Sequence, residues 1–284
     1  MPLITNVPPP SLPYGTEEYS RKYQDQYSNV LRLYFNQLFN LFATLFSETG
    51  GSYIRFPNGA FYQDGATALT GAMTNVSTTP ILVGDTSAFA LTAGALIIGT
   101  EVIKYTGKTA TSFTGITRGA YGSTAAAHAI GVVVTEAQPV ASATTAATLV
   151  MSQTTASNGV AINSTDKTKI VFSVSGRYNI QFSVQMLTYT TAADNITLWF
   201  RQNGVDIPYS AGIATVPGTH GGIAGATLVS WNFVQDIDAG DYIQLLFSSD
   251  SGNSVCATYP AGTAPVHPVS PSAILTATFV SALN

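Results

Sequence analysis

The chain has 284 residues, which is enough for two or three compact units with hydrophobic cores. Only 9% of its residues are charged, and 11 lysines and arginines stand against 15 aspartates and glutamates, which gives a net charge of −4. This charge argues against electrostatic binding to nucleic acid, and a surface so poor in charge suits a permanent assembly better than a freely diffusing enzyme.

The single cysteine, Cys256, permits no disulfide within the chain and no multi-cysteine metal site, so we interpret it as a small buried apolar residue. The N-terminus lacks the basic start and apolar core of a secretion signal. No apolar run reaches the ~18 residues of a membrane span. We therefore expect a protein that is made in a cytoplasm and does not insert into a membrane.

Residues 1–15 contain five prolines, which predict an extended, polyproline-like arm. Two interpretations of this arm remain open. It is either a disordered leader or a segment that docks on a neighbouring protein.

Residues 16–49 predict one long helix, with Thr16 as its N-cap and Gly50 and Gly51 as its end. Apolar residues recur along it in alternating steps of four and three, which is the spacing of a coiled-coil seam. The seam consists of Tyr27, Leu31, Tyr34, Leu38, Leu41 and Leu45.

A second apolar set lies beside this seam and consists of Val30, Leu33, Phe35, Phe39 and Phe42. The predicted helix is therefore apolar over more surface than one partner helix would cover. It either packs against the β domain of its own chain or forms a parallel bundle of identical chains. Its bulky aromatic residues favour a bundle of three or more.

Residues 50–78 are predicted to be a collar or linker, with a short strand from Tyr53 to Phe56 and a turn at Pro57-Asn58-Gly59. Residues 79–135 predict a separate small β module, because short strand-like runs alternate there with Gly-containing turns. His128 has no Cys, Asp or Glu near it at ligand spacing, so we interpret it as a hydrogen-bonding loop residue.

The module resembles a small β module found inserted in phage tail and neck proteins. The resemblance rests on a pattern of spaced glycines, one glutamate and aromatic residues, followed by an Arg-Gly pair and a histidine. Its residues are Gly94, Gly99, Glu101, Ile103, Tyr105, Phe113, Gly115, Arg118, Gly119 and His128. It implies a virion component and names no chemistry.

Residues 137–284 predict about eight strands, because apolar and polar residues alternate between Asn-Gly and Asp-Gly type turns. This even spacing is typical of a β-sandwich.

The same residues resemble the jelly-roll heads of the C1q and tumour-necrosis-factor superfamily. The matching positions are Gly176, Tyr178, Ile180, Phe182, Asn203, Gly204, Gly240, Asp241, Ile243, Leu245 and Phe279. Because such heads are trimers, the resemblance implies a homotrimer. The whole chain is similar to tail-fibre-like virion structural proteins of marine tailed phages, although residues 79–135 read as an insertion relative to them.

The expected fold class is therefore mainly β, with an N-terminal α-helix in a trimeric coiled coil, a small β module and a C-terminal C1q/TNF-like jelly roll. Catalysis is the function class that the sequence supports least. Ser210, His220 and Asp206 contain the side chains of a hydrolytic triad but no nucleophile elbow. Asp236, Asp238 and Asp241 crowd one turn, where they suit the turn itself better than acid–base catalysis or calcium binding. We assign no catalytic residue, cofactor or metal.

Binding is better supported than catalysis. The loops at 205–224 and 252–271 are long and carry Tyr209, His220, Tyr259 and His267, which we interpret as candidate receptor-binding residues. Aromatic rings beside Asn and Thr suit sugars. The alternative is that both loops pack against a neighbouring subunit. Trp199 and Trp231 lie within predicted strands and are interpreted as core or interface residues.

The sequence thus predicts a homotrimeric fibre of a tailed-phage virion, attached to other virion proteins through its N-terminal arm and presenting a jelly-roll head to a host surface glycan. One alternative is a capsid-decorating or head–tail junction protein with a mechanical role. An enzyme that degrades host glycans is a third hypothesis.

Overall fold

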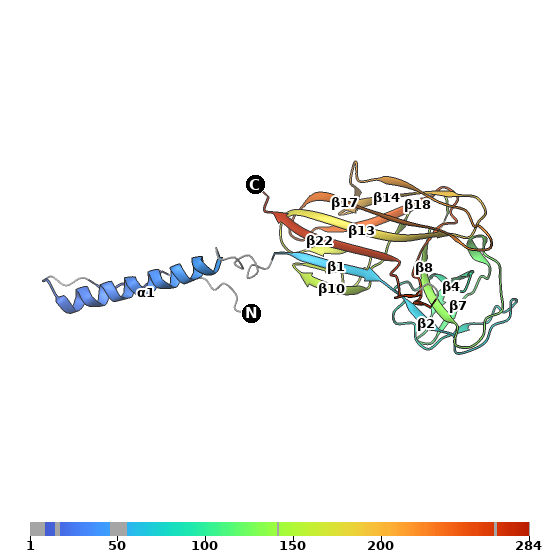
Figure 1. The fold of residues 1–284 in the computed structure, drawn as a ribbon, viewed down its shortest axis with the longest axis horizontal. Coiled ribbons are helices and arrows are strands. Elements are labelled where there is room, and N and C mark those ends of the chain that lie inside the picture. The colour runs from blue at the N-terminus through green and yellow to red at the C-terminus, as the bar shows by residue number, and fades with distance from the viewer. Residues whose placement is uncertain (1–8, 15–17, 46–55, 141, 264–265, 284) are drawn as a thin grey trace. The chain divides into compact units, whose positions relative to one another are not determined.

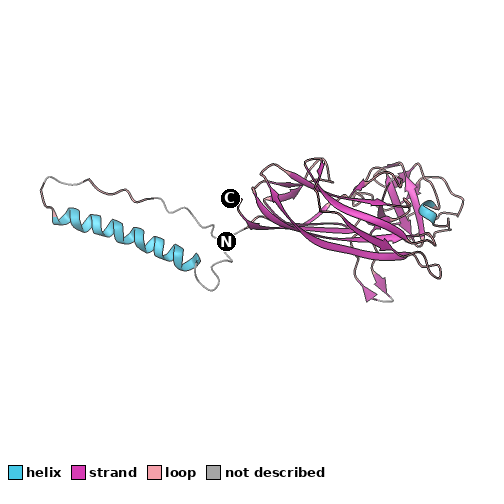
Figure 2. Ribbon diagram, turned by 90° about the horizontal axis from the view of Figure 1, so that it is seen from above, coloured by secondary structure: helices cyan, strands magenta, loops and turns pink. Residues whose placement is uncertain are grey.

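The computed structural model describes residues 9–14, 18–45, 56–140, 142–263 and 266–283. The chain forms two compact units, a helical unit from Met1 to Phe56 and a β unit from Pro57 to Asn284. Figure 1 shows the elements in chain order, and Figure 2 separates the helix from the strands by colour. The fold is mainly β, as the sequence predicts.

The helical unit contains α1 (Arg21–Leu45). Its first turn is capped by Ser20, whose Oγ accepts a hydrogen bond from the backbone N–H of Tyr23 at 3.4 Å. The helix therefore begins later than predicted. The predicted cap, Thr16, and the predicted end at Gly50 and Gly51 lie outside the described residues, as do residues 50–55 of the predicted collar.

The described helix, α1, is not of the kind that crosses a bilayer, since it lacks the apolar character that a membrane span requires.

The β unit is a sandwich built on two large sheets. The first sheet has ten strands, with β13 (Gly176–Thr188) at its centre. Its order is β10 (Gln153–Asn158), β1 (Asn58–Gln63), β22 (Ala273–Ser281), β13, β19 (Val255–Ala257), β8 (Val133–Pro139), β4 (Gly94–Ile98) and β5 (Glu101–Tyr105). In addition, β17 (Gly225–Ile237) pairs with β13, and β2 (Ala66–Ala68) pairs with β8.

The second sheet has seven strands. Its order is β11 (Val160–Ile162), β12 (Ile170–Phe172), β18 (Tyr242–Ser249), β14 (Asp194–Gln202) and β15 (Val205–Asp206), with β16 (Gly212–Val216) paired to β14 and β9 (Ala147–Thr148) paired to β18. Smaller elements are β3 (Ile81–Leu82), β6 (Gly107–Lys108), β7 (Ser112–Thr114), the 3-10 helix η2 (Ala120–Gly122), β20 (Gly262–Thr263) and β21 (Val266–His267).

The sandwich core lies between the two large sheets. Along β13, Tyr178, Ile180, Phe182, Val184 and Met186 point inward and are 0–4% exposed, in the alternation that the sequence predicts. They pack against the inward side chains of β14 and β18. The predicted turn between β14 and β15 also forms, because Asn203 and Gly204 adopt φ values of 50° and 84°. Such a two-residue hairpin requires a positive φ at both positions.

The β module predicted at 79–135 lies between β1 and β10, and it also takes in residues 66–78 of the predicted collar, because β2 pairs with β8 and Leu69 and Met73 join its buried cluster. The module has its own buried cluster around Leu96, Ile103 and Phe113. It is nevertheless continuous with the sandwich, because β8 pairs with β19 of the first sheet. A third buried cluster, which includes Ala95, Tyr121, Leu187 and Val255, joins the module to the end of β13.

Strand β1 changes the predicted boundaries. It falls within the residues assigned from sequence to a collar at 50–78, yet it pairs with β10 and β22 in the first sheet. The head therefore does not begin at 137, and the module interrupts it after its first strand. Sequence patterns miss this pairing because the six residues of β1 find their partners far along the chain.

Candidate functional site and interaction surfaces

The seam of helix α1 is its least exposed face. Tyr27, Leu31, Tyr34, Leu38 and Leu41 are all half-buried, and Leu45 lies in the helix although its side chain is outside the described part. The rings of Tyr23 and Tyr27 stack along the same stripe, with centroids 6.1 Å apart. One helix thus presents the predicted seam as a continuous stripe.

The second apolar set leaves large side chains in water. Leu33, Phe35, Phe39 and Phe42 are 50–70% exposed, while Val30 is half-buried. From Leu33 to Leu45 the helix has no charged residue. Large apolar side chains are therefore exposed on an uncharged part of the helix surface.

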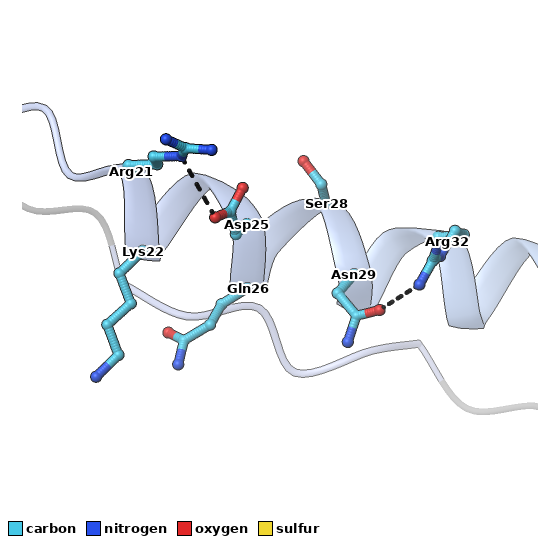
Figure 3. Close-up of a pocket in the computed structure, with 7 residues that line it drawn as sticks. All are labelled: Arg21, Lys22, Asp25, Gln26, Ser28, Asn29 and Arg32. Carbon is cyan, nitrogen blue, oxygen red and sulfur yellow. Dashed lines mark hydrogen bonds and ion pairs between the residues drawn. The ribbon is translucent and has the colours of Figure 1, made fainter.

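The charged residues of α1 gather in its first half (Figure 3). Arg21 Nε lies 4.0 Å from Asp25 Oδ2, and Arg32 Nη2 donates to Asn29 Oδ1 at 2.9 Å. The Arg21 and Asp25 side chains are 89% and 75% exposed, so this pair stabilises the helix little. The helix is therefore polar near its start and apolar near its end.

The outer face of the first sheet is almost free of charge. On β13, β17 and β22 the charged residues are Arg177 and Asp236, which pair at one end of the face with Nε–Oδ1 and Nη2–Oδ2 distances of 2.6 and 2.9 Å. The remaining outward side chains are small, polar and uncharged, or aliphatic. They are Asn179, Gln181, Ser183, Gln185, Ala226, Leu228, Ser230, Asn232, Val234, Ile274, Thr276, Thr278 and Val280.

Strand β17 borders this face and has a free edge. Its 13 residues pair with β13 in unbroken register, from Gly176 with Ile237 to Thr188 with Gly225. In the described sheets no strand pairs with its other side. Side chains reach that side near both ends: Thr227 Oγ1 donates to the carbonyl of Thr215 at 3.0 Å, and Gln202 Nε2 donates to the carbonyl of Asp236 at 3.4 Å. Between these contacts β17 is an edge strand without charged residues.

The outer face of the second sheet is different, because it carries charged and aromatic side chains together. Asp206 Oδ1 accepts hydrogen bonds from Trp199 Nε1 at 2.9 Å and from Arg201 Nε at 2.7 Å. Lys169 Nζ lies 4.6 Å from the centre of the Tyr242 ring. Exposed charged pairs of this kind contribute little to stability. Trp199 is thus on the outer face rather than in the core, whereas Trp231 packs against the core.

The four predicted receptor-binding residues do not come together. Tyr209 follows β15, at the end of the sandwich where β1 begins and β22 ends. His220 lies at the opposite end, since its neighbour Thr219 donates to Thr190 just beyond β13. Tyr259 and His267 belong to the connection from β19 to β22, which starts at that same opposite end.

Tyr209 combines complete exposure with backbone strain. Its side chain is 101% exposed and its φ is 63°, a left-handed conformation that costs a bulky residue ~1–2 kcal/mol. The adjacent Ser210 fixes the turn, because its buried Oγ accepts from Phe200 N at 3.0 Å and donates to the carbonyl of Ile207 at 2.8 Å. The fold therefore holds this ring in water, and Ile213 nearby on β16 is 77% exposed.

The other three residues differ in exposure. His220 is exposed beside Ile223 in a tight turn, in which their backbones exchange hydrogen bonds of 3.1 and 3.0 Å. Tyr259 is half-buried, its backbone is bridged to Ser270, and burial raises its pKa. His267 Nδ1 lies 2.8 Å from the carbonyl of Pro268.

The side chains considered for catalysis are also separated. Ser210 precedes β16 and His220 follows it, so the length of this strand lies between them, and Asp206 is held by Trp199 and Arg201. Asp241 accepts from Gln202 and Asn203, as expected of a turn residue. Within the described residues, no three His, Cys, Asp or Glu side chains are grouped as metal ligands.

The motif of the inserted module forms one buried network around Glu101. This carboxylate is 0% exposed, and Arg118 binds both of its oxygens at 2.7 Å. Backbone N–H groups of Gly119 and Ala126 donate to it at 3.0 and 3.1 Å, and His128 Nε2 lies 2.7 Å from Oε2. Burial alone would raise the pKa of Glu101, but the hydrogen bonds from Arg118, His128 and the backbone lower it to about 2.

This network explains the residue types of the motif. The prediction that His128 is a hydrogen-bonding loop residue is confirmed, and its partner is Glu101. Arg118 also reaches the carbonyls of Thr74 at 2.7 Å and Ala126 at 2.6 Å, so it ties two loops to the strand β5. A signal in the sequence was Glu101 at the start of a strand with buried apolar residues, because a buried carboxylate requires a partner.

A comparison with protein-family models found no match for this chain, and a comparison with curated proteins found none either. Its function is therefore argued from the sequence and the geometry described above.

Proposed function

We propose that the protein is a homotrimeric structural component of a tailed-phage virion, a fibre that presents its β unit for attachment to a host surface. The observation that carries the trimer is exposed apolar surface on both units of the chain. Helix α1 exposes Phe35, Phe39 and Phe42, and the β unit exposes Leu228 and Val234 along an uncharged face. A soluble single chain rarely leaves such surface in water.

The connections between the two sheets support a jelly roll. From β10 the chain passes to β11 and β12 in the second sheet, then to β13 in the first and to β14 and β16 in the second. It returns to β17 in the first sheet, crosses to β18, and closes with β22 between β1 and β13. Repeated crossing of this kind, with a late strand placed beside early ones, is typical of jelly rolls.

The positions of the apolar patches favour a closed ring of subunits. One patch lies on the edge formed by β17, Tyr209 and Ile213, and the other lies on the outer face of the first sheet near Tyr62 and Ile274. Because the two patches differ, a contact between the edge of one subunit and the face of the next is heterologous. Such contacts form a closed ring when each subunit is rotated by the same fraction of a full turn, as in a three-fold trimer. In this proposal Tyr209 contacts a neighbouring subunit rather than a receptor.

Host attachment is then assigned to the end of the sandwich opposite the start of β1. His220 lies at that end, and the connection that carries Tyr259 and His267 begins there. Three copies of a weak site on one rigid head bind a repetitive glycan surface far more tightly than one copy does. The resemblance of the module to phage tail and neck modules supports a place in the virion, with residues 1–15 as the contact to other virion proteins.

The test is a competition experiment with the purified full-length protein. Host cells that have been incubated with the trimer should adsorb fewer phage particles, and the variant Tyr259→Ala/His267→Ala should compete less well while keeping the same sedimentation coefficient. A trimer that never competes would overturn host attachment and favour a mechanical role on the capsid or at the head–tail junction. Release of sugar from host glycans by the purified protein would instead indicate an enzyme.

A further inference from the structure

A second buried carboxylate, Glu136 on β8, lies where the inserted module meets the sandwich. Its backbone N–H donates to the carbonyl of Gly65 at 2.8 Å, and its own carbonyl accepts from Thr258 N at 3.1 Å. Its side chain is 0% exposed. Glu136 therefore contacts two segments: the corner after β1, at Gly65, and the connection after β19, at Thr258.

The Glu136 carboxyl group has few partners. Gln63 Nε2 donates to Oε2, and Leu91 N donates to Oε1 at 3.2 Å. The backbone of Ala90 also interacts with the carboxyl group and lowers its pKa. A Cβ atom on Gly65 would lie 2.8 Å from Oε2, so the corner closes directly over the carboxyl group. The side-chain oxygen of Gln63 is itself buried and has no hydrogen-bond partner in the described structure.

Glu101 provides the contrast, because it is a buried carboxylate with several hydrogen-bond donors and a bonded cation. Glu101 has a bidentate arginine, a histidine and two backbone N–H groups, whereas Glu136 has no cation bonded to it. The nearest cation, Lys108, donates its Nζ to the carbonyls of Thr86, at 3.1 Å, and Phe89. An ionised Glu136 would be a buried charge without a bonded counter-ion, which is strongly unfavourable.

The titratable groups that face Glu136 come from several elements. Tyr105 on β5 donates its hydroxyl to the carbonyl of Leu91 at 3.0 Å, Lys108 lies on β6, and the Cys256 thiol lies on β19. Asp64 is the neighbouring carboxyl group in the corner, and burial raises its pKa as well. Of these groups only Lys108 carries a positive charge, which lowers the pKa of Glu136, but burial raises that pKa by more.

We propose that Glu136 is a proton-controlled latch, which holds the corner Gln63–Gly65 and the loop Ala88–Leu91 closed when neutral and lets water enter between them when ionised. This inference does not depend on the virion role. Burial raises the pKa of Glu136 from 4.5 to about 7. The closed state therefore binds a proton more tightly than the open state, and its advantage falls as pH rises from about 4.5 through 7.

Hydrogen exchange of the full-length protein tests the latch. After correction for intrinsic exchange rates, protection of peptides 60–66 and 86–92 should fall roughly thirtyfold between pH 5.5 and pH 8.5, given pKa values near 7 when closed and 4.5 when open. In Glu136→Gln, which keeps the shape and cannot ionise, protection should not change with pH. Peptide 228–236 of β17, far from the latch, should be insensitive to pH in both proteins.

A second variant distinguishes the titration of Glu136 from that of its neighbour Asp64, and it keeps the test possible if Glu136→Gln fails to fold. Asp64→Asn should retain the full pH dependence. Equal protection of the wild-type peptides at both pH values would overturn the proposal. So would pH dependence that persists in Glu136→Gln or disappears in Asp64→Asn, since the proton would then belong to another group.

Discussion

At the scale of single residues, the molecule uses two fully buried glutamates in opposite ways. Glu101 is ionised and held by Arg118 and by backbone N–H groups, so it fixes loops to a strand. Glu136 accepts from Gln63 and from the backbone at Leu91 and Ala90, has no cation bonded to it in the described structure, and burial raises its pKa to about 7. The difference lies in the number of donors and in the bonded cation, because burial disfavours the ionised form at both positions.

Removal of the Arg118 side chain should therefore destabilise the β unit. Arg118→Ala leaves Glu101 as a buried charge without its counter-ion, so we expect a loss of about 3–5 kcal/mol in the free energy of unfolding, measured by urea denaturation. The matched control is Arg201→Ala at the exposed Arg201–Asp206 pair, which should cost no more than about 1 kcal/mol. Equal losses in the two variants would show that the Glu101 network is not a structural tie.

Tyr209 is the residue at which strain and exposure coincide. Tyr209→Asn should relieve the left-handed backbone and raise the unfolding free energy of the dissociated chain by about 1 kcal/mol. The same change removes the proposed subunit contact, so sedimentation should show dissociation at an at least tenfold higher protein concentration. Tyr209→Phe keeps the ring and should leave association unchanged. Unaltered association of Tyr209→Asn would return Tyr209 to the candidate receptor residues.

At the scale of elements, helix α1 and strand β17 are the two whose surfaces their own chain does not complete. The helix has a half-buried seam and a separate exposed aromatic stripe. The strand pairs with another strand on one side only. In both, residues with the right local pattern form a regular element, and apolar side chains of that element remain exposed.

The seam of α1 is tested by a charge at its centre. Leu38→Asp would place three carboxylates at the axis of a parallel bundle, so we expect monomers at micromolar concentration in sedimentation velocity. Asn36→Asp adds the same charge on the exposed face of the helix and should leave the trimer intact. A trimer that survives Leu38→Asp would mean that the β unit alone organises the assembly.

At the scale of the whole molecule, we expect the uncharged outer face of the first sheet to stabilise the trimer and to contribute little to the stability of the single chain. Leu228→Lys brings three lysines into the proposed subunit contacts and should weaken trimer association at least tenfold, measured by sedimentation equilibrium. Because Leu228 is 59% exposed in the single chain, the unfolding of the dissociated chain should hardly change. Ser164→Lys, at an exposed turn, is the control, and equal association of both variants would contradict this interface.

Local patterns were sufficient to predict several parts of the fold. The period of the seam gave the helix, the alternation around Ile180 and Phe182 gave a core strand, and Asn203-Gly204 gave a hairpin turn. Each of these depends on residues close together in sequence. His128 was also predicted to be a hydrogen-bonding residue, but its partner Glu101 lies on the strand β5 and could not be named from local pattern.

Long-range pairing decided what the sequence left open. β1 was predicted as part of a collar, and it joins the sandwich only because β10 and β22 return beside it. Tyr209 was grouped with His220 by loop composition, yet the length of β16 puts them at opposite ends. The partners of Glu101 and Glu136 also come from distant segments. By itself the sequence determined the helix and the alternation of inward and outward side chains along strands such as β13; only the tertiary structure decided which distant residues meet, because those contacts depend on strand order and register rather than on local periodicity.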